Sequence, residues 1–205
     1  MLKISDFFLN KKKDNLLSVG YLEIQPGQLV NLVGDNRSGK SLLFKTIHGD
    51  YYNYSGDIII KEKPAVLYRK RKQTALVECH SHLLYSETVW NNILLPFPRL
   101  NSRMKMKISE LCLLAGIDNI LQDKVRNISF SQQKFIEIIR AVVQLPYLIM
   151  IDDLDVYFDD ENYKKALEVL NFAISSGSSV IVSSKQKLDQ MDRVLKIETS
   201  TVREL

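Results

Sequence analysis

The sequence is poor in cysteine and has no long apolar run. Its 205 residues include two cysteines, Cys79 and Cys112, which are too few for a disulfide framework and are not spaced as metal ligands. No apolar run reaches the roughly 18 residues that a membrane helix needs, and residues 1–9 do not form a signal peptide. We therefore expect reduced thiols and a protein that stays in the cytoplasm.

Excess charge of one sign is also absent. The net charge is +4, and the one basic cluster, at residues 69–72, has the sequence RKRK. Such a cluster could meet nucleic acid or acidic lipid headgroups, but no aromatic stacking pattern accompanies it. A solvated loop between two strands is the favoured interpretation, and no nucleic-acid partner is expected.

Strand and helix patterns alternate along the chain. Strands are predicted over 16–24, 29–33, 57–60, 74–77, 147–151, 179–182 and 193–197, and helices over 41–47, 131–144 and 161–175, with a helical pattern over 86–126. This order predicts an α/β fold with a mainly parallel core sheet, N-terminal antiparallel strands and a helical insertion at approximately 86–144. No linker marks a second domain, so one domain over 1–205 is expected, with only a short tail after the last strand.

Residues 34–41 read GDNRSGKS and fit G-x-x-x-x-G-K-[ST] at each fixed position, between a predicted strand and a predicted helix. The glycines let backbone N–H groups surround phosphate oxygens, and the helix N-terminus adds its dipole. Lys40 would neutralise the β- and γ-phosphates, and the Ser41 hydroxyl would bind magnesium. The expected nucleotide-binding residues here are Gly34, Asp35, Asn36, Arg37, Ser38, Gly39, Lys40, Ser41 and Leu42. The alternative is a chance glycine turn with a lysine, which the register of strand, loop and helix disfavours.

A second acidic element follows the apolar strand at 148–151. Asp152 would hold magnesium directly or through water, and Asp153 would lie near the attacking water. Alone this pattern is weak, because aspartate often ends strands as a turn or helix cap. Together with the phosphate-binding loop it indicates a P-loop nucleotide site.

Three further segments carry a family resemblance: PGQ at 26–28, SGDI at 55–58, and RAVV followed by a proline at 140–146. With the phosphate-binding loop and the acidic strand, they make nearly the whole chain resemble the ATPase subunits of ABC transporters. The segment TVWNNI at 88–93 and the compact insertion resemble most the small ATPases of the cell-division FtsE and lipoprotein- or macrolide-exporter branch.

The resemblance implies ATP and Mg²⁺ as cofactors, and a head-to-tail dimer of identical or different ATPase subunits that traps ATP between the subunits. It also implies an integral-membrane partner on a separate chain, docked near residues 79–96. The protein would then be peripheral on the inner face of the cell membrane. The leading hypothesis is an ATP-binding, slowly ATP-hydrolysing subunit that couples nucleotide-driven dimerisation to this partner.

The signature motif of the family, LSGGQ, is altered here. Residues 128–132 read ISFSQ, so Ser129, Ser131 and Gln132 are the candidate nucleotide contacts, and both glycines are lost. Those glycines let a helix N-terminus approach the γ-phosphate of the opposite subunit. Phe130 is the residue least compatible with that approach, and a plain capped helix start is an open alternative.

Other family positions also differ. The catalytic glutamate corresponds to Asp153, which is one methylene shorter, so the attacking water can be misplaced. The metal-sensing glutamine corresponds to Cys79, for which Glu78 would substitute only if the loop shifted by one residue. The switch histidine corresponds to Lys185, which either reaches the γ-phosphate as a point charge or is a solvated lysine. Asp159 occupies the place of the dimer-contact aspartate.

Two other functions stay open. Loss of auxiliary residues favours a nucleotide-dependent docking module with negligible hydrolysis. A P-loop small-molecule kinase would need an arginine-rich lid, for which 69–72 is the one candidate, and the spacing from Ser129 to Asp153 fits the ABC family better. The aromatic residue that stacks on adenine is unassigned: Phe7 and Phe8 lie near the expected place, and Lys11 is at the aligned position.

Overall fold

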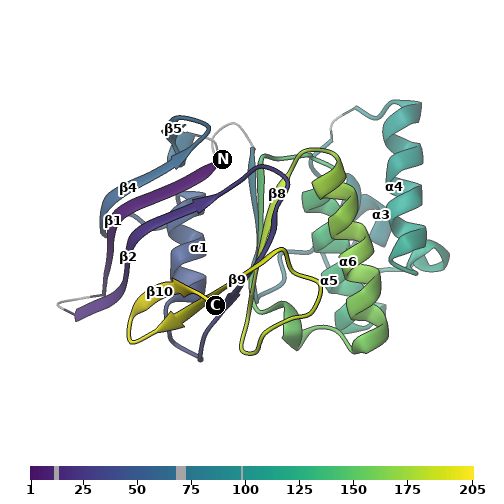
Figure 1. Cartoon of the computed structure of the whole chain (residues 1–205). Coiled ribbons are helices and arrows are strands. Elements are labelled where there is room, and N and C mark those ends of the chain that lie inside the picture. The colour runs from purple at the N-terminus through teal and green to yellow at the C-terminus, as the bar shows by residue number, and fades with distance from the viewer. Residues whose placement is uncertain (12–13, 68–72, 98) are drawn as a thin grey trace.

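The computed structural model describes residues 1–11, 14–67, 73–97 and 99–205. The basic cluster at 69–72 and the side chain of Lys11 lie outside this described part. Within it, ten strands form one sheet (Figure 1). Their order across the sheet is β5 (Lys63–Pro64), β4 (Tyr54–Ile60), β1 (Leu2–Lys11), β2 (Asp14–Ile24), β10 (Thr201–Glu204), β9 (Arg193–Glu198), β3 (Leu29–Val33), β8 (Ser179–Ser184), β7 (Leu148–Ile151) and β6 (Thr74–Val77).

The sheet has a parallel and an antiparallel part. Strands β9, β3, β8, β7 and β6 pair in parallel, whereas β5, β4, β1 and β2 pair antiparallel. The residues of β3, β7 and β8 are buried throughout, which is typical of strands covered on both faces. The predicted α/β fold, with its mainly parallel core and antiparallel N-terminal strands, is therefore confirmed.

The expectation of a short tail after the last strand is wrong. The chain reverses at Thr199 and Ser200, whose φ angles are 47° and 60°, and returns as β10 beside β9. Two consecutive positive φ values are typical of a two-residue hairpin turn, which usually carries asparagine or glycine. Threonine and serine do not signal such a turn, so the sequence did not reveal β10.

The helices divide between the two faces of the parallel strands. Helix α1 (Lys40–His48) packs on one face, in the cluster that also includes the antiparallel strands, whereas α3 (Val89–Leu94), α4 (Ser102–Leu114), α5 (Phe130–Val142) and α6 (Asp160–Ser175) cover the other face (Figure 1). The three predicted single helices start and end within two residues of α1, α5 and α6. The stretch 86–126 contains α3, α4 and a short 3-10 turn (Asp118–Ile120), and a second 3-10 turn (Val125–Asn127) begins at its end. None of the helices in the described residues is long and apolar enough to cross a membrane.

Two apolar clusters hold this arrangement. One includes Leu32 of β3, Phe44 of α1 and the antiparallel strands, and the other includes Ile149 of β7 and Phe135 of α5. Because β3, β7 and β8 are parallel, their carboxyl ends meet at one edge of the sheet. The fold therefore brings together the segments that follow them, which begin at Gly34, Asp152 and Lys185. The single-domain assignment over 1–205 stays a prediction.

Candidate functional site

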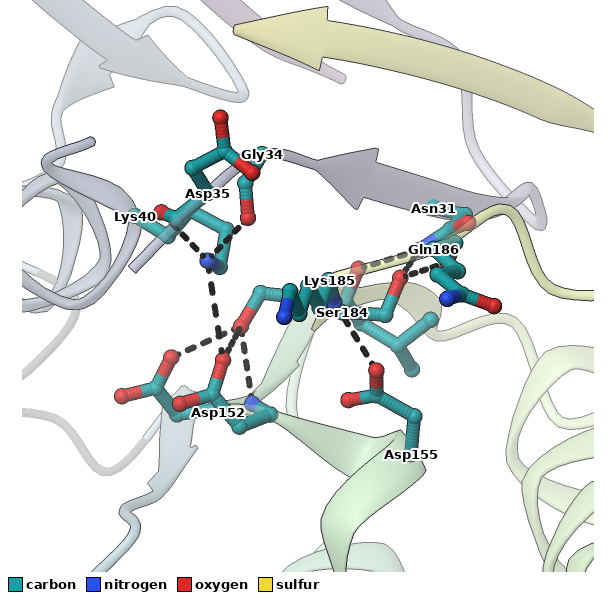
Figure 2. Close-up of polar contacts among 12 residues, drawn as sticks. Asn31, Gly34, Asp35, Lys40, Asp152, Asp155, Ser184, Lys185 and Gln186 are labelled. Carbon is teal, nitrogen blue, oxygen red and sulfur yellow. Dashed lines mark hydrogen bonds and ion pairs between the residues drawn. The ribbon is translucent and has the colours of Figure 1, made fainter. Parts of the chain in front are cut away.

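The loop between β3 and α1 wraps around the side chain of Lys40. This side chain is 4% exposed, and its Nζ donates hydrogen bonds to the carbonyl oxygens of Gly34 (2.6 Å) and Asp35 (3.2 Å) (Figure 2). The same Nζ lies 3.8 Å from Oδ1 of Asp153. One ammonium group thus connects the phosphate-binding loop to the acidic residues after β7.

The two glycines of the loop are needed for different physical reasons. A Cβ on Gly34 would lie 2.8 Å from Oγ of Ser38 and 3.2 Å from Cβ of Ile197, so a side chain there would force Ser38 to move. Gly39 has a φ of 104°, which disfavours any residue with a Cβ. Helix α1 begins directly after Gly39 without a side-chain cap. Its first backbone N–H groups therefore have no partner within the helix and fit an anion at this end.

The hydroxyl of Ser183 joins the two aspartates that follow β7. It donates a hydrogen bond to Oδ1 of Asp152 (2.7 Å) and accepts one from the backbone N–H of Asp153 (2.8 Å). Asp152 is 4% exposed. Ser183 belongs to the neighbouring parallel strand β8, 30 residues along the chain from Asp153. This contact was not expected from the sequence, because no motif connects the two positions.

Asp153 combines an unusual backbone with a perturbed carboxyl. Its φ and ψ angles are 49° and 55°, in the left-handed region that aspartate tolerates better than most residues. Burial raises the pKa of its carboxyl, the charge of Asp152 raises it further, and Lys40 opposes both effects. A carboxylate with a raised pKa accepts a proton more readily near neutral pH, as a general base requires.

The residues at this site fit a magnesium ion. Within the described ranges, the buried Asp152 carboxylate accepts one hydrogen bond, from Ser183, and has no ion pair. An ionised carboxylate in such a place is costly without a counter-charge. Oxygen donors are the ligands that Mg²⁺ prefers, and Asp152 with the exposed hydroxyl of Ser41 supplies that chemistry.

A cavity of about 570 Å³ lies over the phosphate-binding loop, and its lining is both charged and apolar. Its lining combines Lys40 and other loop residues with the apolar side chain of Leu16 and the ring of Tyr51. The described lining residues are Leu16, Asn36, Arg37, Ser38, Gly39, Lys40, Ser41, Leu42, Lys45, Tyr51 and Asp153. Sequence reasoning missed Leu16, Lys45 and Tyr51, which no motif connects to the loop. The cavity suits a molecule that carries both anionic groups and an apolar group.

The aromatic residues considered for adenine stacking lie elsewhere. Phe7 is fully buried in the core, where its ring centroid lies 5.6 Å from that of Tyr54. Phe8 is 46% exposed and is not among the residues that line the cavity. The structure therefore gives neither phenylalanine a place beside the loop.

The other predicted site residues do not line this cavity. Ser129 caps α5: its side chain accepts from the backbone N–H of Gln132, while the Gln132 side chain accepts from the backbone N–H of Ser129. Ser131 contributes a hydroxyl 3.1 Å from that of Ser129. The exposed Lys185 is held by its backbone N–H, which donates to Asp155 (2.9 Å) (Figure 2).

The segment after β6 is held by ion pairs. Glu78 bonds Lys45 of α1 through one carboxylate oxygen (2.8 Å) and the ring of His82 through the other (2.8 Å). Burial raises the pKa of Glu78, but the contacts with Lys45 and His82 outweigh it and the net shift is downward. The neighbouring Cys79 is exposed. Glu78 therefore does not line the cavity itself but contacts Lys45, which does.

Comparison with known proteins decides the family. The family model described as "ABC transporter" matches residues 18–155, which include the phosphate-binding loop and both aspartates. The chain belongs to the ABC transporter family. A solved structure of the ATP-binding subunit of an ABC transporter superposes with a TM-score of 0.86, covering 100% of this chain and 89% of that one. Its sequence identity is 19%, so this likeness bears on the fold alone.

Curated relatives of this ABC-family chain are importer subunits. The methionine import ATP-binding protein MetN of Clostridioides difficile is 27% identical over 175 residues, covering 80% of this chain and 54% of MetN. The zinc import ATP-binding protein ZnuC of Wolbachia pipientis is 27% identical over 171 residues, covering 83% of this chain and 67% of ZnuC. The chain spans about half the length of the MetN proteins it matches. These relatives do not support the narrower cell-division or exporter branch.

Proposed function

We propose that this chain is an ATP-binding, slowly ATP-hydrolysing subunit that couples nucleotide-driven dimerisation to a separate integral-membrane partner. One observation carries the proposal: Lys40 lies between the loop carbonyls and Asp153, 3.8 Å from that carboxylate, at the end of an uncapped helix. This arrangement suits a nucleotide whose phosphates lie at α1 and whose attacking water lies at Asp153. Asp152 and Ser41 would hold Mg²⁺, which would neutralise phosphate charge.

The slow rate is inferred from three differences at the site. Asp153 has a shorter side chain than glutamate, Cys79 lacks a side-chain carbonyl oxygen to offer to magnesium, and Lys185 replaces the switch histidine. A displacement of about 1 Å in the attacking water costs on the order of a hundredfold in rate. ATP binding is thus expected to be retained better than turnover.

The alternative is a docking module that binds ATP and regulates its partner without turnover. The altered signature segment favours this alternative. Phe130 is 53% exposed at the start of α5, where the family has a glycine that admits a close approach of the opposite nucleotide. In a dimer of different subunits, an intact signature on the second subunit would complete the site at Lys40. The kinase hypothesis gains no support from the family match, and its lid candidate lies outside the described residues.

A second cavity offers a binding surface for the proposed membrane partner. It has a volume of about 560 Å³ and includes His82 at one end of the predicted docking segment 79–96 and Leu95 and Pro96 at the other. Its wall also includes Arg140 of α5. Because this cavity adjoins α5 and the Glu78 segment, an inserted segment of the partner would touch both. The importer relatives support a transporter partner, which would place the chain at the inner membrane face.

Phosphate release at saturating ATP and Mg²⁺, alone and with the membrane partner, separates the two functions. Lys40→Ala and Asp153→Asn serve as matched controls, because the first removes the phosphate contact and the second removes the base while preserving size. Release that both substitutions abolish supports a slow ATPase. Tight ATP binding that only Lys40→Ala abolishes, without release above that control, would leave the docking module.

A further inference from the structure

Lys134 is a lysine buried inside the helical part of the chain. It lies on α5, is 1% exposed, and its Nζ donates a hydrogen bond to the backbone carbonyl of Glu78 (2.7 Å). The same Nζ bonds Oε2 of Glu137, three residues along the helix, at 2.7 Å. It also lies 4.3 Å from the ring centroid of Tyr157. One ammonium group thus contacts three segments that are far apart in the sequence.

Glu137 completes this arrangement from the same face of α5. It is 4% exposed, and its second oxygen, Oε1, accepts a hydrogen bond from the backbone N–H of His82 (2.7 Å). The Lys134–Glu137 pair therefore holds both ends of the segment 78–82, one end through a donor and the other through an acceptor. A buried ion pair of this kind is weak evidence for stability, because desolvation offsets most of the attraction.

The segments held by this pair flank the nucleotide cavity. Glu78 extends its carboxylate to Lys45, which lines the cavity. Tyr157 ends the short turn that follows Asp153, and the ring of Phe130 packs on Tyr157 with centroids 5.4 Å apart. The start of α5, the turn after Asp153 and the segment 78–82 are therefore connected through one buried group.

We propose that Lys134 and Glu137 are positioning residues of the nucleotide site. They hold the segment 78–82 and the turn after Asp153 in fixed positions relative to α5. Neither residue lines the nucleotide cavity at the phosphate-binding loop, so both act on it through Glu78 and Tyr157. The proposal rests on the proposed function for its effect on turnover. It further implies that a ligand bound in the nucleotide cavity beside Lys45 changes the surroundings of Cys79, the residue after Glu78.

The test replaces the pair by apolar residues of similar volume, as Lys134→Met with Glu137→Leu. Such a replacement of a buried ion pair is often neutral or stabilising, but here it also removes the side-chain partners of the Glu78 carbonyl and the His82 N–H, so denaturant unfolding of the variant is measured beside its activity. We expect ATP affinity to match that of the unmodified chain. We expect kcat for phosphate release to fall by roughly 10- to 100-fold, because the turn after Asp153 and the segment 78–82 lose the side-chain contacts that hold both against α5. Lys134→Arg, which keeps a donor for Glu78, is expected to retain more activity.

A second readout does not depend on turnover. Cys79 is exposed, whereas Cys112 is fully buried, so a maleimide reagent labels Cys79 in the folded chain. In the apolar pair variant we expect faster labelling of Cys79, because both ends of its segment are released. We also expect ATP with Mg²⁺ to change the labelling rate of the unmodified chain, and this response to be lost in the pair variant.

The surface pair Lys165–Glu161 on α6, joined at 2.6 Å, supplies the matched control. Lys165→Met with Glu161→Leu should change neither readout. A folded apolar pair variant of Lys134 and Glu137 with normal kcat and normal Cys79 labelling would overturn the proposal. So would a loss of kcat that merely follows a loss of folded protein. If the unmodified chain releases no phosphate above Lys40→Ala, the proposed function fails, and the labelling response to ATP still decides the role of the pair.

Discussion

At the scale of single residues, Ser183 has the most demanding contacts of the candidate site. Its hydroxyl is fully buried, donates to the carboxylate of Asp152 and accepts from the backbone N–H of Asp153. A hydroxyl can do both at once, because it carries one proton and two lone pairs. Removing it would leave a buried carboxylate and a buried N–H without these partners.

Replacing Ser183 by alanine is expected to lower the free energy of unfolding by about 1–3 kcal/mol, the usual cost of unsatisfied buried groups. It should also weaken Mg²⁺-dependent ATP binding, because Asp152 is no longer held in orientation. Denaturant unfolding and titration with ATP at several Mg²⁺ concentrations measure the two effects. Ser183→Thr, which keeps a hydroxyl on a strand, is the control. Unchanged Mg²⁺-dependent ATP binding in a folded Ser183→Ala protein would show that the Ser183 hydroxyl is not needed to orient Asp152.

Contact with Tyr157 explains why a phenylalanine is accommodated at position 130. The residue is incompatible with the family signature, yet its ring packs on Tyr157 with the ring planes inclined by 50°. Tilted aromatic pairs at such a distance are favourable beyond the area that they bury. The sequence could not pair the two residues, because they come from different elements and no spacing rule connects them.

At the scale of elements, the start of α5 resolves one open alternative in part. The contacts of Ser129 and Gln132 form a capping box, so the interpretation as a capped helix start is correct for the isolated chain. A nucleotide contact across a dimer is a separate role for Ser129, and it stays a prediction. Both roles use the Ser129 hydroxyl. A substitution that still caps the helix but has no hydroxyl therefore separates them.

Replacing Ser129 by alanine is expected to lower the free energy of unfolding by about 1 kcal/mol, because one N-terminal N–H of α5 loses its acceptor. Ser129→Asn should restore most of this loss, since asparagine caps helices as well as serine does. Thermal unfolding measures both. If the alanine variant is as stable as the unmodified chain, the capping contact contributes nothing. Nucleotide-dependent dimerisation of the asparagine variant then tests the contact with the opposite subunit.

At the scale of the whole molecule, β10 joins the two parts of the sheet. It pairs antiparallel with β9 and meets β2 where Thr201 lies beside Ser18. The backbone N–H of Ser18 also donates to the carbonyl of Ser200 (2.7 Å). These bonds connect the antiparallel strands to the parallel core that carries Lys40 and Asp152.

Truncation after Glu198 is therefore expected to destabilise the chain and to expose the unpaired edges of β2 and β9, which promotes association between molecules. The measurement is denaturant unfolding combined with light scattering. ATP binding should weaken as well, because β3 lies directly beside β9. A truncated chain that stays monomeric with unchanged stability and ATP affinity would show that β10 is dispensable.

Local sequence patterns by themselves determined much of this protein. The phosphate-binding loop, the acidic strand end and the α/β order are short-range features, because backbone turns and strand burial depend on adjacent residues. They indicated the α/β fold and the family, and two of the residues that they picked out, Lys40 and Asp153, line the cavity. They did not identify the branch of the family.

The tertiary structure decided which distant residues meet. Ser183 on Asp152, Tyr51 and Leu16 at the cavity, Phe130 on Tyr157, and Lys134 on Glu78 each join separate elements. Such contacts depend on strand order and helix packing, which no local spacing encodes. The β10 hairpin was missed for a related reason, since Thr199 and Ser200 adopt a turn that their residue types do not favour. Their conformation is set by the pairing of β10 with β9, and that pairing exists only in the folded sheet.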